Sequence, residues 1–86
     1  MYKNKFNDRN NICGVNIAKM RKNMTPKMSQ QVLASKLQLI GLDVDKNAIQ
    51  RIENGKRFVT DIELSALSQL FNVPADKLLK SGEINR

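Results

Sequence analysis

The fold of this chain depends on a stretch in its middle, residues 46–56, which reads KNAIQRIENGK. On a helix at 100° per residue, its apolar residues fall together on one side, which the pattern predicts to be buried. These residues are Ala48, Ile49 and Ile52. The opposite side carries only polar side chains that can donate hydrogen bonds: Lys46, Asn47, Gln50, Arg51 and Asn54. Asp45 is suited to cap the first turn, and Gly55 to end the helix in a left-handed conformation.

The polar side of this helix carries the residue types that read bases in a DNA major groove. Arg pairs bidentately with guanine, while Asn and Gln pair bidentately with adenine. A surface helix of any soluble protein is also polar outside, so a plain solvated face is the alternative explanation. The rest of the chain bears on this choice.

The charge of the chain is unevenly distributed. Its 86 residues carry a formal net charge of +7, and the length suits one small domain. Residues 1–57 hold 12 Lys and Arg against 4 Asp and Glu, whereas residues 58–86 hold 3 against 4. A basic front and a nearly neutral rear predict a polyanion on one side and a second subunit on the other.

Several classes of protein are disfavoured by what the chain lacks. Cys13 is the single cysteine, so no internal disulfide forms, and there is no His. No apolar run approaches the roughly 18 residues of a membrane span, and the polar start is unlike a signal peptide. Cys13 lies on an apolar stripe, and no carboxylate pair is placed for acid–base work. We expect a soluble cytoplasmic protein that is not an enzyme and binds no metal or cofactor.

Hydrophobic periodicity predicts an all-α fold of five helices within residues 13–80. The basic arm before it, residues 1–12, is expected to be disordered, with contact to a DNA backbone or minor groove as the alternative. Residues 81–86 form a tail. The inward positions expected of the first, second and fourth helices are Cys13, Ile17, Met20 and Met24; Leu33, Ala34, Leu37 and Ile40; and Leu64, Leu67 and Phe71.

Signals for the starts and ends of these helices agree with the periodicity. The first helix is expected from about residue 14 to residue 24. Ser29 is a good N-cap for the second helix, with Met28 before it as a hydrophobic staple, and Gly41 is its expected end. Thr60 and Glu63 form a capping-box signature for the fourth helix. A short fifth helix, containing Leu78 and Leu79, begins after the break at residues 72–74.

Taken in order, these features resemble the Cro and phage-repressor (Xre-type) family of helix-turn-helix proteins. The motifs that carry the resemblance are Gly14, Ile17 and Arg21; Ser29-Gln30-Gln31-Val32-Leu33-Ala34; Ile49 to Lys56; and Leu64 to Val73. Each motif alone is weak, but their order and matching caps make a specific signal. The resemblance implies a five-helix, lambda-repressor-like domain that places the helix over residues 45–54 in the major groove.

The resemblance also implies roles for individual residues. Those expected to contact bases are Lys46, Asn47, Gln50 and Arg51, and those expected to contact phosphates are Gln30, Asn54, Lys56 and Arg57. Arg21 and Glu53 are expected to form a partly buried ion pair between the first and third helices. The alternative for each outward side chain is simple solvation.

Two connections depart from the family pattern. The loop between the first and second helices is about two residues longer, and the segment from Ala34 to Ile49 is about five residues longer. An extended second helix is expected to take up part of the latter insertion. The angle between the second and third helices, and therefore the set of residues that reaches bases, stays open.

Together these observations predict a sequence-specific transcriptional regulator, a repressor, that binds double-stranded DNA at a two-fold operator as a homodimer. The alternative is an antitoxin that binds a small toxin protein and regulates its own promoter. A controller protein of a restriction-modification system is a variant of the first function. The residues expected to form the dimer surface are Phe58, Val59, Ile62, Leu79 and Ile84.

Overall fold

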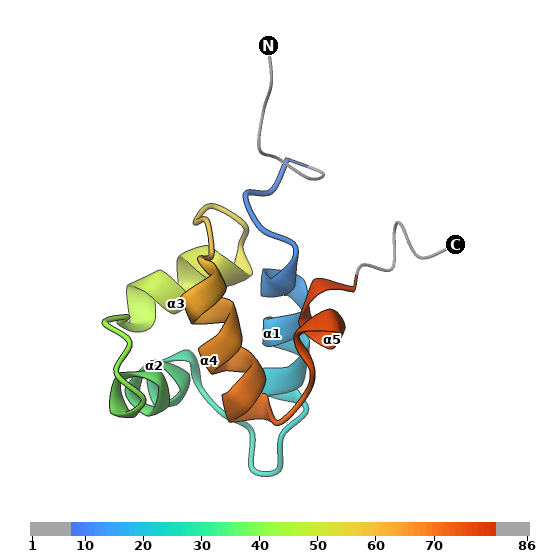
Figure 1. The fold of residues 1–86 in the computed structure, drawn as a ribbon. Coiled ribbons are helices and arrows are strands. Elements are labelled where there is room, and N and C mark those ends of the chain that lie inside the picture. Colours follow the sequence, from blue (N-terminus) through green and yellow to red (C-terminus); the bar gives the residue numbers. More distant parts are fainter. Residues whose placement is uncertain (1–7, 81–86) are drawn as a thin grey trace.

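The computed structural model describes residues 8–80, and within them the chain forms five helices and no strand (Figure 1). The helices are α1 (Cys13–Lys22), α2 (Gln30–Leu39), α3 (Lys46–Glu53), α4 (Asp61–Phe71) and α5 (Ala75–Leu79). Helix α1 contacts α3 and α5, α2 contacts α3 and α4, and α4 contacts α5. The predicted all-α architecture is confirmed. Predictions for residues 1–7, for the tail at 81–86 and for Ile84 lie outside the described residues.

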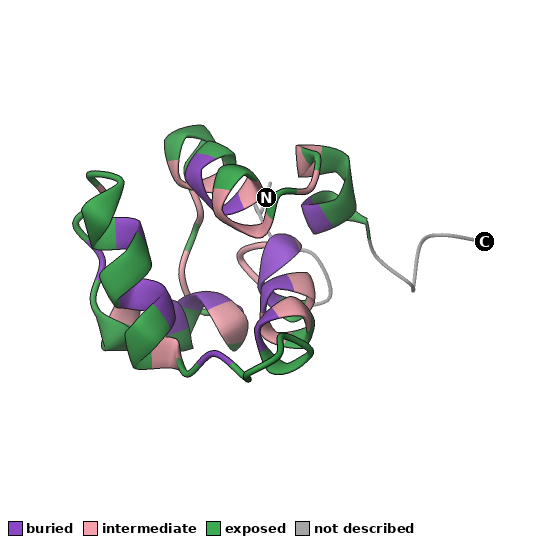
Figure 2. Cartoon of the chain, turned by 90° about the horizontal axis from the view of Figure 1, so that it is seen from below, coloured by how far each residue is buried: buried purple, intermediate pink, exposed green. Residues whose placement is uncertain are grey.

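The core consists of aliphatic side chains contributed by all five helices. Figure 2 shows the buried residues on the sides of the helices that face one another, with exposed residues outside. The side chains enclosed almost completely include Ile17, Leu33, Leu37, Ile49, Ile52, Leu67 and Leu78. Burying one such side chain contributes about 1.5–3 kcal/mol, so this cluster is the main source of stability.

Two of the predicted inward positions are wrong. Met24 is 38% exposed because α1 ends two residues earlier, which places Met24 beyond the last turn. Ile40 is 44% exposed because it is the C-cap of α2, after which the chain turns at Gly41 with φ at 105°. Met28 and Val44, from the loops that follow these helices, are buried in the core instead.

The predicted N-caps of α2, α3 and α4 are all formed. The side chains of Ser29, Asp45 and Thr60 accept hydrogen bonds from the backbone N–H three residues on, at 3.1, 2.8 and 3.1 Å. Glu63 completes the capping box by accepting from the Thr60 N–H at 3.1 Å. Each cap pairs a backbone donor that the helix itself leaves unpaired, typically worth about 1 kcal/mol.

The long connection between α2 and α3 is closed by hydrogen bonds of its own. The Leu42 N–H donates to the Leu37 carbonyl at 3.1 Å, and the Gly41 N–H donates to the Gln38 carbonyl at 3.0 Å. The Gln38 side-chain amide then reaches across the connection to the Val44 carbonyl at 2.7 Å. The insertion is therefore an ordered turn that fixes how α3 leaves α2.

Helix α1 lies very close to α3 at Gly14. A Cβ atom built on Gly14 would lie 2.0 Å from the backbone oxygen of Ile52. No non-bonded pair of atoms tolerates this distance, and the backbone oxygen cannot rotate away as a flexible side chain could. Glycine at this position thus sets the spacing between α1 and α3.

We predict that Gly14→Ala lowers the free energy of unfolding by about 1–3 kcal/mol, because α1 and α3 must move apart to admit the methyl group. Ser65→Ala, on the exposed side of α4, is the matched control and should stay within about 0.5 kcal/mol of the parent chain. Chemical denaturation of both variants gives the comparison. A Gly14→Ala variant as stable as the parent would contradict the close approach.

Candidate nucleic-acid interface

Helix α3 turns one side into the core and presents the other to solvent. Ile49 and Ile52 are buried and Ala48 is partly buried. The four residues expected to contact bases are all exposed: Lys46, Asn47, Gln50 and Arg51. The outer side of the helix therefore offers two cations and two amides, without a carboxylate among them, as partners for base edges.

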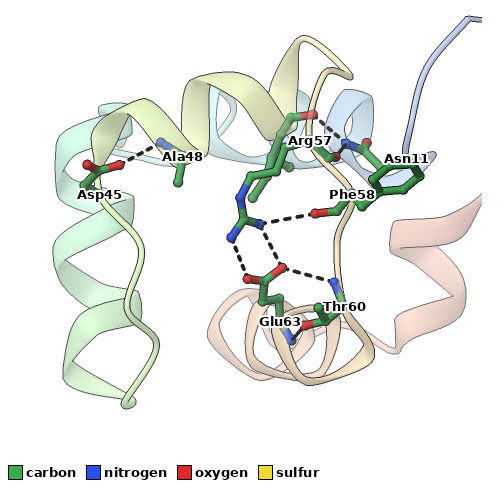
Figure 3. A network of polar contacts seen from close by, with 8 residues as sticks. Asn11, Asp45, Ala48, Arg57, Phe58, Thr60 and Glu63 are labelled. Carbon is green, nitrogen blue, oxygen red and sulfur yellow. Dashed lines mark hydrogen bonds and ion pairs between the residues drawn. The ribbon is translucent and has the colours of Figure 1, made fainter.

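Both ends of α3 are closed by specific hydrogen bonds. At its start, Asp45 caps the Ala48 N–H (Figure 3). At its end, Gly55 adopts φ of 84°, while the Gly55 N–H donates to Ile52 and the Lys56 N–H donates to Arg51, at 3.1 and 2.9 Å. This left-handed ending favours glycine because a Cβ would crowd the backbone. Closed ends restrict fraying of so short a helix.

An ion pair between Arg21 of α1 and Glu53 of α3 holds the inner edge of α3. Arg21 Nε lies 2.7 Å from Glu53 Oε2, Nη2 lies 2.8 Å from Oε1, and the two side chains are only 11% and 9% exposed. Arg21 Nη1 also donates to the Met28 carbonyl at 3.0 Å. The hydrogen bonds to Glu53 raise the pKa of Arg21, and burial opposes this effect. Because the fork is planar, the pair fixes direction as well as distance.

Gln30, at the start of α2, joins the same carboxylate. Its Nε2 donates to Glu53 Oε1 at 2.9 Å, so Glu53 receives hydrogen bonds from both α1 and α2. A side-chain amide has two N–H groups, and the second is available for a phosphate oxygen. One carboxylate thus links three helices beside the expected phosphate contact.

The loop that follows α3 carries the remaining residues expected to contact phosphates. Asn54 and Lys56 are exposed, and Asn54 Oδ1 accepts from the Lys56 N–H at 3.2 Å. Arg57 is different: its Nη1 and Nη2 donate to Glu63 of α4, both at 2.9 Å (Figure 3). These bonds lower the pKa of Glu63. The guanidinium of Arg57 therefore joins this loop to α4. Its expected contact with a phosphate stays a prediction.

Comparison with protein families identifies this arrangement of helices. A family model described as helix-turn-helix matches residues 17–78, most of the chain. The chain belongs to the Xre/Cro-like helix-turn-helix family. A search of curated proteins and a search of solved structures found no significant match. By its family, the chain is a DNA-binding transcription regulator in the general sense.

In this helix-turn-helix, α2 and α3 are the two helices of the motif, and α3 holds the place of the recognition helix (Figure 1). The four residues expected to contact bases lie on the exposed face of the recognition helix. Gln30 contacts the same helix through its hydrogen bond to Glu53. Arg57, in the loop after α3, is paired with Glu63 of α4. Individual DNA contacts remain predictions.

Three residues of the helix-turn-helix chain that sequence reasoning missed lie before α1. Arg9, Asn10 and Asn11 belong to the segment expected to be a loose arm, yet they hydrogen-bond to the end of α3 and the loop after it. Their partners lie 41 to 46 residues away in the sequence, so no local pattern marks them. A partial clue is the spacing of Asn11 and Gly14, since Asn11 Oδ1 accepts from the Gly14 N–H at 2.8 Å.

The described residues offer neither a membrane-spanning helix nor a metal cluster. Among residues 8–80 no helix is long and apolar enough to cross a membrane. The same residues contain no group of three or more His, Cys, Asp or Glu side chains able to hold a metal ion. Burial raises the pKa of the Cys13 thiol to about 11, so Cys13 stays protonated and is a poor nucleophile at neutral pH.

We predict that Arg21 and Glu53 are energetically coupled. Glu53→Ala should cost about 2–4 kcal/mol, because it leaves the Arg21 guanidinium buried without its partner. A double-mutant cycle with Arg21→Ala should give a coupling above about 1 kcal/mol. Gln30→Ala, which removes a neutral partner of the same carboxylate, is the control and should cost less. A coupling near zero would mean that the pair does not orient α3.

Proposed function

We propose that the chain is a sequence-specific transcriptional repressor that binds a two-fold operator as a homodimer, with α3 in the major groove. The observation that carries the proposal is the outer face of α3, where four exposed donors stand on a helix fixed by Arg21 and Glu53. Repression requires only that the bound protein occupies the promoter. The proposal gives the protein no catalytic role and no cofactor, and places it in the cytoplasm.

The charge of the chain supports binding to the DNA backbone. The exposed cations Lys46, Arg51 and Lys56 lie along α3 and directly after it. Positively charged side chains that neutralise phosphates release counterions, so binding weakens as salt rises. Base contacts contribute the sequence preference, and backbone contacts contribute affinity for any duplex. Arg51 and Lys56 are the candidates for these two roles.

We predict that Arg51→Ala and Lys56→Ala weaken DNA binding in different ways. Arg51→Ala should cost about 1–3 kcal/mol on the preferred site and little on random duplex, because the lost contact reads a base. Lys56→Ala should weaken all sequences about equally and reduce the salt slope by about one unit. Titrations of both duplexes at several salt concentrations give these values, after selection of the preferred site from a random pool.

Each variant serves as the control for the other. Equal loss on both duplexes for Arg51→Ala would assign Arg51 to a phosphate. Binding of the parent chain that does not change with salt would contradict the proposed DNA-facing surface.

The proposed dimer surface lies in the neutral rear half of the chain. Phe58, Ile62 and Leu79 are 56%, 70% and 42% exposed, so folding of one chain leaves these large apolar side chains in water. Val59 packs partly against the core and contributes less than expected. One reading helix covers one half-site, and a two-fold dimer doubles the contact without new sequence.

We predict that Ile62→Gln weakens self-association about tenfold or more, because each dimer loses apolar burial at two copies of the side chain. Leu39→Gln is the matched control, since Leu39 is 88% exposed but lies at the end of α2. Sedimentation over a range of concentrations measures both. A parent chain that is monomeric at high concentration, free and on DNA, would refute the dimer.

The same apolar residues also suit the alternative function, in which the main partner is a small toxin protein. The two functions differ in what covers Phe58 and Ile62: a second copy of the chain or a different protein. The mass of the natively purified complex distinguishes them. Twice the mass of the chain supports the repressor, and an added smaller protein supports the antitoxin.

A further inference from the structure

The segment before α1 forms hydrogen bonds to the C-terminal end of α3. Arg9 Nη2 donates to the carbonyls of Ile52 and Glu53, at 3.3 and 2.7 Å. The Asn11 side-chain amide donates to the same Ile52 carbonyl at 3.0 Å. These carbonyls belong to the last turn of the helix, where most backbone oxygens lack a partner within the helix.

The same segment also holds the loop that follows α3. The Asn10 N–H donates to the Gly55 carbonyl at 2.7 Å, and the Asn10 side chain donates to the Lys56 carbonyl at 3.0 Å. The Asn11 side chain donates to the Arg57 carbonyl at 2.7 Å. From residue 52 to residue 57, only the Asn54 carbonyl is without a hydrogen bond from residues 9–11.

The side chain of Arg9 lies between two glycines. A Cβ on Gly14 would lie 2.7 Å from Arg9 Nη2, and a Cβ on Gly55 would lie 2.9 Å from both Cγ and Cζ of Arg9. Both distances are shorter than ordinary van der Waals contact. Arg9 therefore fits between α1 and the end of α3 because Gly14 and Gly55 have no side chains.

The positive charge of Arg9 is also suited to its position at the C-terminal end of α3. The C-terminal end of a helix carries a partial negative charge, equivalent to about half an elementary charge. Here that end leads directly into Asn54 and Lys56, the residues expected to meet negatively charged phosphates. A cation on the last carbonyls offsets the negative end and lowers its repulsion of the DNA backbone.

We propose that Arg9, with Asn10 and Asn11, is a clamp that sets the position of the base-reading face of α3 relative to the backbone-contacting loop after it. The inference rests on the proposed reading role of α3. Arg9 is a positioning residue: it acts through the carbonyls it holds and does not itself touch the DNA. Loss of the clamp lets α3 shift relative to the loop, so that Arg51 no longer reaches its base while Lys56 keeps its phosphate.

The test compares Arg9→Gln and Arg9→Lys in the full chain, with Lys19→Gln as the control for loss of one exposed positive charge. Affinities are measured for the selected duplex and for a random duplex, at several salt concentrations, together with the fraction of folded protein. Arg9→Gln should weaken the selected duplex about tenfold and the random duplex much less, with the salt slope unchanged. Arg9→Lys should recover most of the loss, because an ammonium also donates to last-turn carbonyls.

Two outcomes overturn the clamp. Equal loss on both duplexes with a salt slope smaller by about one unit makes Arg9 a direct phosphate contact. A folded Arg9→Gln variant that binds like the parent makes the segment a purely structural support.

Asn10→Ala covers the case in which Arg9→Gln does not fold. This substitution removes one side-chain hydrogen bond to the Lys56 carbonyl and leaves the Asn10 backbone hydrogen bond in place. It should lower the ratio of the affinity for the selected duplex to that for the random duplex about twofold to fivefold. An unchanged ratio overturns the proposal. Arg51→Ala on the same duplexes separates the clamp from the proposed function. If Arg51→Ala does not selectively weaken the selected duplex, α3 does not read bases, whatever the result for Arg9.

Discussion

The ion pair between Arg21 and Glu53 is the contact on which the orientation of α3 depends. Desolvating both charges offsets much of their attraction, so the pair adds little net stability. Its effect is directional: a planar guanidinium meeting both carboxylate oxygens allows only a narrow range of angles between α1 and α3. Removing one partner lowers the free energy of unfolding, since the other charge would remain largely buried without a partner.

The C-terminal end of α3 is held far more firmly than its N-terminal end. The side chain of Glu53 is bound by Arg21 and Gln30, and its carbonyl is bound by Arg9. At the other end, Asp45 supplies a single cap. Because α3 has only eight residues, anchoring one end and burying Ile49 and Ile52 is sufficient to keep its outer face in one orientation. These contacts at the C-terminal end of α3 do not involve the turn between α2 and α3.

Features that depend on residues close together in one helix could be predicted from the sequence pattern. The distant pair of Arg21 and Glu53 was expected only through the family resemblance. The two sides of α3, its cap at Asp45 and its ending at Gly55 follow from residues a few positions apart. The helical period predicts Met24 and Ile40 to be buried, but each lies beyond the last residue of its helix, where the chain turns. The pairing of Arg57 with Glu63 and the hydrogen bonds of Arg9 to the end of α3 form between separate elements. The sequence around a basic residue in a polar segment does not indicate which partner it will have.

Whether α3 reads bases in the major groove is tested most directly by methylation interference on the selected site. Methyl groups on guanine N7 lie in the major groove, and those on adenine N3 lie in the minor groove. If α3 reads bases there, N7 methylation of one guanine in each half-site blocks binding of the parent chain, and Arg51→Ala loses its sensitivity to methylation at that same guanine. Interference at adenine N3 alone, or the same guanine pattern for parent and variant, would contradict it.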